Sequence, residues 1–126
     1  MGESELLEML ASEADRRTPT ILEGVKRLTE PAEPDAKGIE AVRVEAHGLK
    51  GAAMVVGQNR LSELARQIEI ALVQRTAPGV IDPELADTLA GAAEAFRQGV
   101  QAAANGEPEP ATVGESLAAL ERHSED

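Results

Sequence analysis

Apolar residues recur along the chain at intervals of three and four, and stretches that alternate with a period of two are hard to find. The first spacing is typical of α-helices and the second of β-strands. Clusters of proline, glycine and acidic residues separate the apolar stretches and favour turns. The pattern therefore predicts an all-α helix bundle, with helices over about residues 5–28, 36–56, 59–72, 83–104 and 112–120.

One face of each of the first four predicted helices is apolar, and these faces identify the expected core. On the second helix the face consists of Ile39, Val42, Ala46, Leu49, Ala53 and Val56. On the first, third and fourth helices it consists of Leu6, Leu7, Leu10, Ala14, Ile21, Val25 and Leu28, then Leu61, Leu64, Ala65, Ile68 and Leu72, then Leu85, Leu89, Ala92, Ala93, Phe96 and Val100.

Several residues indicate where helices begin or are interrupted. Pro19 lies inside the first helix, so a kink or a break is expected at residues 17–19. Asn59 is expected to cap the third helix, because its side chain can accept a hydrogen bond from a free backbone amide. Thr112 and Glu115 have the spacing of a capping box and are expected to begin the last helix.

Alternating glutamate and proline over residues 107–110 cannot continue a helix and divide the chain. Residues 1–106 are predicted to form the bundle, and residues 107–126 a linker, a short helix and a flexible tail. The short helix has one apolar side, so it either docks on the bundle or frays. His123 lies in the predicted tail and is expected to be solvated.

Composition and charge exclude several classes of function. The chain has 126 residues and a net charge of −11, which disfavours binding to nucleic acids and to anionic membranes. It has no cysteine, so disulfides and thiolate zinc sites are excluded. No apolar run approaches the ~20 residues of a membrane span, and the acidic N-terminus does not resemble a secretion signal. We expect a cytoplasmic location and no partner that is a membrane or a nucleic acid.

The second predicted helix carries the most informative polar residue, His47. At about 100° per residue, His47 lies well away from the centre of the apolar face and should point to solvent. Arg43, Lys50 and Gly51 lie four residues before it and three and four after it, so they share its face. Cations beside a neutral imidazole can hold an incoming phosphoryl group. Exposed histidines are common on helices, however, and this pattern by itself leaves a functional and a solvated His47 equally open.

Gly51 is unusual because glycine inside a helix costs about 1 kcal/mol relative to alanine. Space beside His47 for a docking partner would explain it. The run from Ala46 to Ala53, with Gly57 after it, resembles the phosphoacceptor helix of histidine phosphotransfer (HPt) domains, in which the pattern is roughly His-x-Leu-Lys-Gly. The likeness is greatest to the phosphotransfer domain of chemotaxis-type histidine kinases, in which a glutamate follows the histidine by 22 residues, as Glu69 follows His47 in this chain.

The resemblance implies an antiparallel four-helix bundle with a short additional C-terminal helix. It also implies that His47 is phosphorylated on Nε2, that Lys50 steadies the phosphoryl oxygens and that Gly51 admits the partner. Glu69 would accept the proton of Nδ1 and so fix the tautomer. Gly48 departs from the family pattern, which more usually has a small hydroxyl or amide residue after the histidine.

The predicted function is relay of a phosphoryl group between His47 and the aspartate of a response-regulator receiver. The chain has no phosphate-binding loop of its own, so a histidine kinase catalytic domain or a receiver would supply the group. No cofactor or metal site is expected in the chain, and Mg²⁺ would come with the partner. Arg43, Met54, Ile70 and Val73 are predicted to contribute to docking, and packing of Met54, Ile70 and Val73 against another helix of the bundle is an equally open alternative.

Two other interpretations compete with this one. The chain could be a non-catalytic helical interaction module that retains the bundle without phosphotransfer. It could also be a metal-dependent enzyme that uses His47, Glu69 and Glu40, although one histidine with scattered carboxylates is a poor set of ligands. A stand-alone shuttle and a domain of a longer kinase are both compatible with the sequence.

Overall fold

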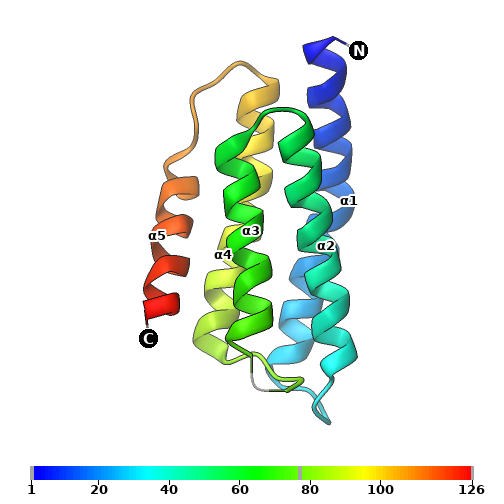
Figure 1. The fold of residues 1–126 in the computed structure, drawn as a ribbon, viewed down its shortest axis with the longest axis vertical. Coiled ribbons are helices and arrows are strands. Elements are labelled where there is room, and N and C mark those ends of the chain that lie inside the picture. Colours follow the sequence, from blue (N-terminus) through cyan, green and yellow to red (C-terminus); the bar gives the residue numbers. More distant parts are fainter. Residues whose placement is uncertain (1, 77, 126) are drawn as a thin grey trace.

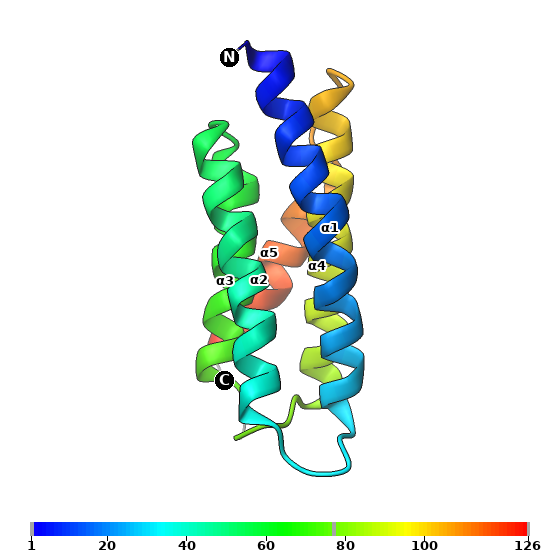
Figure 2. The same ribbon diagram turned by 90° about the vertical axis from the view of Figure 1, so that its right-hand side faces the viewer.

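The computed structural model describes residues 2–76 and 78–125 and consists of helices (Figure 1). Consecutive helices run in opposite directions, and the first four form a bundle in which each packs against two neighbours (Figures 1 and 2). The fifth helix lies outside this bundle, against α3 and α4. The predicted all-α bundle with an additional C-terminal helix is therefore confirmed. The helices are α1 (Glu3–Thr29), α2 (Ala36–Val55), α3 (Asn59–Gln74), α4 (Pro83–Ala104) and α5 (Ala111–Glu125).

The apolar faces of α1 to α4 meet in one core. Most of the residues predicted to form this core are buried, with Phe96, the only aromatic residue, fully enclosed. Leu6, Leu7 and Val56 are half-buried, and Val56 packs against this core. Ile81, in the loop before α4, is also fully buried, and its amide donates to the carbonyl of Leu28 at 3.0 Å. This loop thereby closes one end of the bundle.

Pro19 does not break the first helix. α1 continues through it from Glu3 to Thr29, and Pro19 itself is exposed. A proline removes one backbone hydrogen bond, but the apolar face of α1 continues on both sides of it, from Leu10 to Leu28. Packing of that face on α2 and α4 is the stronger effect and keeps the helix in one piece.

Two predicted helix caps are wrong. Asn59 is the first residue of α3 rather than its cap, and Gln58 occupies the cap position without a side-chain hydrogen bond. α5 begins at Ala111, so Thr112 lies inside the helix, and its hydroxyl donates to Oε1 of Gln98 at 2.7 Å. The hydrogen bond from Thr112 to Gln98 of α4 thus replaces the capping hydrogen bond within α5 that the spacing of Thr112 and Glu115 predicts.

α5 docks on the bundle. Val113 and Leu120 are buried, and a side chain at Gly99 of α4 would collide with Leu61 and approach Val113. The expectation that His123 is solvated is wrong, because its Nε2 lies 3.0 Å from Oγ1 of Thr88. The helix continues to Glu125, where the sequence predicts a tail, and Asp126 lies outside the described residues. α5 packs against α3 and α4, and it does not cover the solvent-facing side of α2.

Candidate functional site

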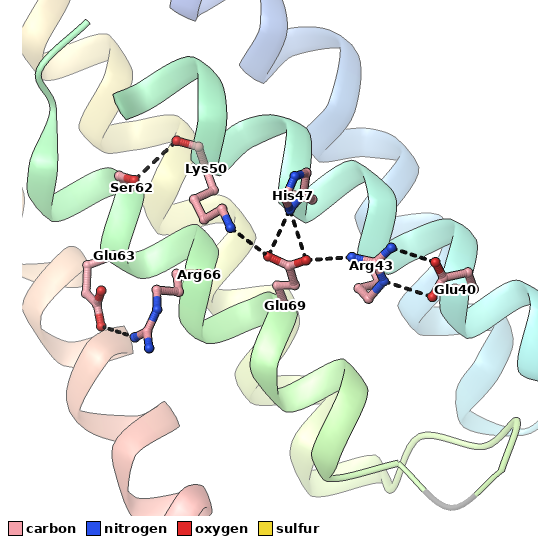
Figure 3. Close-up of polar contacts among 8 residues, drawn as sticks. All are labelled: Glu40, Arg43, His47, Lys50, Ser62, Glu63, Arg66 and Glu69. Carbon is pink, nitrogen blue, oxygen red and sulfur yellow. Dashed lines mark hydrogen bonds and ion pairs between the residues drawn. The ribbon is translucent and has the colours of Figure 1, made fainter. Parts of the chain in front are cut away.

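The short turn between α2 and α3 makes these helices antiparallel neighbours. One hydrogen bond across the pair joins Oγ of Ser62 to the carbonyl of Lys50 at 3.2 Å. This register brings His47, near the middle of α2, beside Glu69 on α3, as Figure 3 shows. The predicted approach of Glu69 to His47 is therefore seen in the structure.

The imidazole of His47 has one engaged and one open nitrogen. Its Nδ1 lies 3.1 Å from Oε2 and 3.3 Å from Oε1 of Glu69. The His47 side chain is 59% exposed, whereas that of Glu69 is only 15% exposed. With Nδ1 turned inward to the carboxylate, Nε2 lies on the opposite edge of the ring and faces away from α3 (Figure 3).

Glu69 is the centre of the polar cluster. Its carboxylate contacts Nη1 of Arg43 at 2.6 Å and Nζ of Lys50 at 3.3 Å, in addition to His47. Burial raises the pKa of Glu69, but the hydrogen bonds from His47, Arg43 and Lys50 outweigh it, and the net effect lowers the pKa. Glu69 is therefore ionised at neutral pH and accepts the Nδ1 proton, which leaves the lone pair of Nε2 free to react.

Arg43 is held between two carboxylates. Besides Glu69 it contacts Glu40 on its own helix, with Nε to Oε2 at 2.8 Å and Nη2 to Oε1 at 2.6 Å. The hydrogen bonds to Glu40 and Glu69 raise the pKa of Arg43. The spacing in the sequence predicts that Arg43 shares the face of His47 on α2. It does not predict the contact with Glu69, because that contact depends on how α3 packs against α2.

Gly48 makes room for a side chain of α1. A Cβ built on Gly48 would collide with the guanidinium of Arg17. That guanidinium donates from Nε to Glu13 at 2.8 Å and from Nη1 to Glu45 of α2 at 3.3 Å. Arg17 lies over Gly48, so a larger residue at this position would require the flexible end of the Arg17 side chain to move.

Gly51 has no such reason within the chain. A Cβ at this position meets nothing within 4 Å in the described structure, and the same holds for Gly91, an exposed glycine inside α4. Both glycines weaken their helices without relieving any intramolecular contact. Gly51, unlike Gly91, lies one turn from His47.

We expect the glycines to respond differently to alanine. Gly51→Ala and Gly91→Ala should each raise the free energy of unfolding by up to about 1 kcal/mol, because alanine restores helix propensity without a clash. Gly48→Ala should gain less or lose stability, since Arg17 has to move. Urea unfolding followed by circular dichroism measures all three. A loss of stability in Gly51→Ala would show that Gly51 serves the fold.

Several apolar side chains on α2 and α3, the two helices that carry the cluster, are exposed or half-buried. Met54 and Val73, two of the predicted docking residues, are 59% and 62% exposed, whereas Ile70 is half-buried. Val44 and Val55 of α2 are also exposed, and the sequence reasoning missed them. Val44 precedes His47 by three residues, so helical spacing alone could have identified it.

Among residues 2–76 and 78–125, no three histidine, cysteine or acidic side chains are grouped so that they could hold a metal ion. Glu40 and Glu69 both point at Arg43, which lies between them (Figure 3).

No helix in the part of the chain that the structure describes is both long and apolar enough to cross a membrane.

The fold and the site together define a helical bundle that presents an exposed imidazole at its surface, with Nδ1 on a carboxylate and Nε2 on the opposite edge of the ring. The family model described as the Hpt domain matches residues 5–106, and the chain therefore belongs to the Hpt domain family. This family carries out histidine phosphotransfer in two-component signalling. The matched residues include nearly all of α1 to α4, and α5 follows them. No curated protein matches the chain.

Proposed function

We propose that His47 accepts a phosphoryl group on Nε2 and relays it to or from the aspartate of a response-regulator receiver. The observation that carries this proposal is the arrangement of the imidazole, with Nδ1 on the ionised Glu69 and Nε2 open to solvent. A partner can reach Nε2 without displacing any part of the bundle. His47 is thus the phosphoacceptor, and Glu69 and Lys50 assist it.

The transfer is a displacement at phosphorus. The lone pair of Nε2 attacks the phosphorus of the donor, and the bond from phosphorus to the donor oxygen breaks, so that the electron pair leaves with the carboxylate of an aspartate or with ADP. The ring gains positive charge and keeps its Nδ1 proton. Glu69 stabilises that charge through the contact at 3.1 Å. Transfer onward to a receiver reverses these steps.

Lys50 is suited to bind the phosphoryl oxygens. It follows His47 by one turn of α2, and among the described residues its ammonium is paired with Oε1 of Glu69 at 3.3 Å. Rotation about its flexible side chain would move that positive charge from Glu69 to a phosphoryl group on Nε2. The Mg²⁺ used in such transfers is proposed to belong to the partner.

The receiver or the kinase catalytic domain is proposed to dock on the face of α2 and α3 that α5 leaves open. Met54, Ile70 and Val73, joined by Val44 and Val55, supply apolar contact area around His47. The open space above Gly51 lets the backbone of a partner approach. The separation of 22 residues between His47 and Glu69 supports a chemotaxis-type system. Because such partners are cytoplasmic, the same location is proposed for the chain.

The test is phosphorylation of the purified chain by a chemotaxis-type kinase catalytic domain with ATP, or by a phosphorylated receiver. We expect a mass increase of one phosphoryl group that is labile in acid and stable in base, and none in His47→Gln. His123→Gln is the matched control, because it removes the other histidine and should be labelled like the wild type. No label from several donors on a folded chain would favour the non-catalytic interaction module.

A further inference from the structure

Two cations contact Glu69, and they are held very differently. Arg43 makes three contacts of 2.6–2.8 Å that join it to both Glu69 and Glu40. Lys50 makes one ion pair of 3.3 Å, to Glu69. Their side chains are similarly exposed, at 26% and 24%, so the difference lies in how each is anchored.

We propose that Arg43 is a positioning residue that keeps Glu69 ionised and directed at Nδ1 of His47 while Lys50 turns to the phosphoryl group. The inference rests on the proposed function of His47. It assigns to Arg43 a role within the site, in place of the docking role that its position in the sequence indicates.

The physical reason is the change of charge during transfer. A phosphoryl group arriving at Nε2 attracts the ammonium of Lys50. If Lys50 were the only cationic side chain beside Glu69, Glu69 would lose that contact as a second negative group approached and before the His47 ring became positive, and its affinity for a proton would rise. Arg43 prevents this because Glu40 anchors it from the preceding turn of α2.

The guanidinium group is suited to this role and an ammonium group is not. Its planar fork directs Nε and Nη2 to Glu40 and Nη1 to Glu69 at the same time. Arg43 contacts Oε2 of Glu69, so Oε1 is available to Lys50. Both oxygens of the carboxylate stay within reach of Nδ1 of His47. Arg43 thereby limits rotation of the carboxylate away from the imidazole.

The first test needs no partner, so it is independent of whether the chain transfers phosphate. We expect Arg43→Gln to raise the pKa of Glu69, read from its ¹³C carboxyl shift, and to lower the fraction of His47 that carries its proton on Nδ1, read from ¹⁵N shifts. Arg43→Lys keeps the positive charge beside Glu69, but it should retain only part of the preference of His47 for the proton on Nδ1. Arg66→Gln is the matched control, because Arg66 pairs with Glu63 three residues before it and makes no ion pair with Glu69. Unchanged Glu69 and His47 signals in a folded Arg43→Gln would overturn the proposal.

The second test separates positioning from docking. Arg43→Gln should slow phosphorylation of His47 by about tenfold in the wild-type background and have little further effect in Glu69→Gln, because both act through one carboxylate. An equal slowing in the two backgrounds would mean that Arg43 contacts the partner directly, and would refute its role as a positioning residue. If the wild-type chain itself is not phosphorylated, the proposed function fails. The spectroscopic test then decides by itself whether Arg43 positions Glu69.

Discussion

Replacing Glu69 by glutamine is expected to slow phosphorylation of His47 by on the order of 10²-fold, at the lower end of what a positioned acid or base contributes. The amide retains the shape of the side chain but not its charge. It cannot stabilise the positive charge that the ring gains, and it can donate to Nδ1 as readily as accept, so it no longer excludes the tautomer with the proton on Nε2. That tautomer has no lone pair on the reacting nitrogen.

Initial rates of phosphoryl transfer from a fixed donor measure this effect. Glu63→Gln is the control, because it removes a carboxylate from the same helix that pairs with Arg66 and makes no ion pair with His47. Circular dichroism should show both variants folded, since the cations around Glu69 remain partly exposed to water. Equal rates for Glu69→Gln and Glu63→Gln would mean that Glu69 has no part in the chemistry.

Phe96→Ala is expected to cost about 3–5 kcal/mol of the free energy of unfolding, the largest loss from any single side chain of this core. Phe96 is fully buried on α4, which packs against α1, α3 and α5. The rest of the core is aliphatic, with many alanines, so its small side chains cannot fill the space that the ring leaves. A domain of this size has about 5–15 kcal/mol in total, so the loss is a large share of its stability.

Urea unfolding of the wild type, Phe96→Ala and Phe96→Leu measures this cost. The leucine variant should lose less, because it fills part of the cavity. The slope with denaturant should be unchanged if only the folded state is affected. A loss below about 1 kcal/mol in Phe96→Ala would show that the helices close around the cavity, contrary to the expectation from an alanine-rich core.

The sequence alone was sufficient for the helices, for most of the core and for the residues near His47 on its own helix. Helical periodicity and side-chain neighbours three and four residues apart are local properties, and they need no knowledge of the other helices. The exposure of His47 follows from its angle to the apolar face of α2. The approach of Glu69 could be predicted only because a short turn makes α2 and α3 neighbours and a family resemblance supplied the partner residue.

Tertiary structure decided the remaining features, because each depends on how two helices pack. The continuation of α1 through Pro19 and the contact of His123 with Thr88 arise from docking of whole helices. The space at Gly48 depends on Arg17, which is 31 residues earlier in the chain. The bond from Arg43 to Glu69 spans 26 residues, and no local spacing indicates it. The spacing of side chains that share a face is a property of one helix. The register between two helices is set by how their surfaces fit together, and that fit decides which charged groups meet at His47.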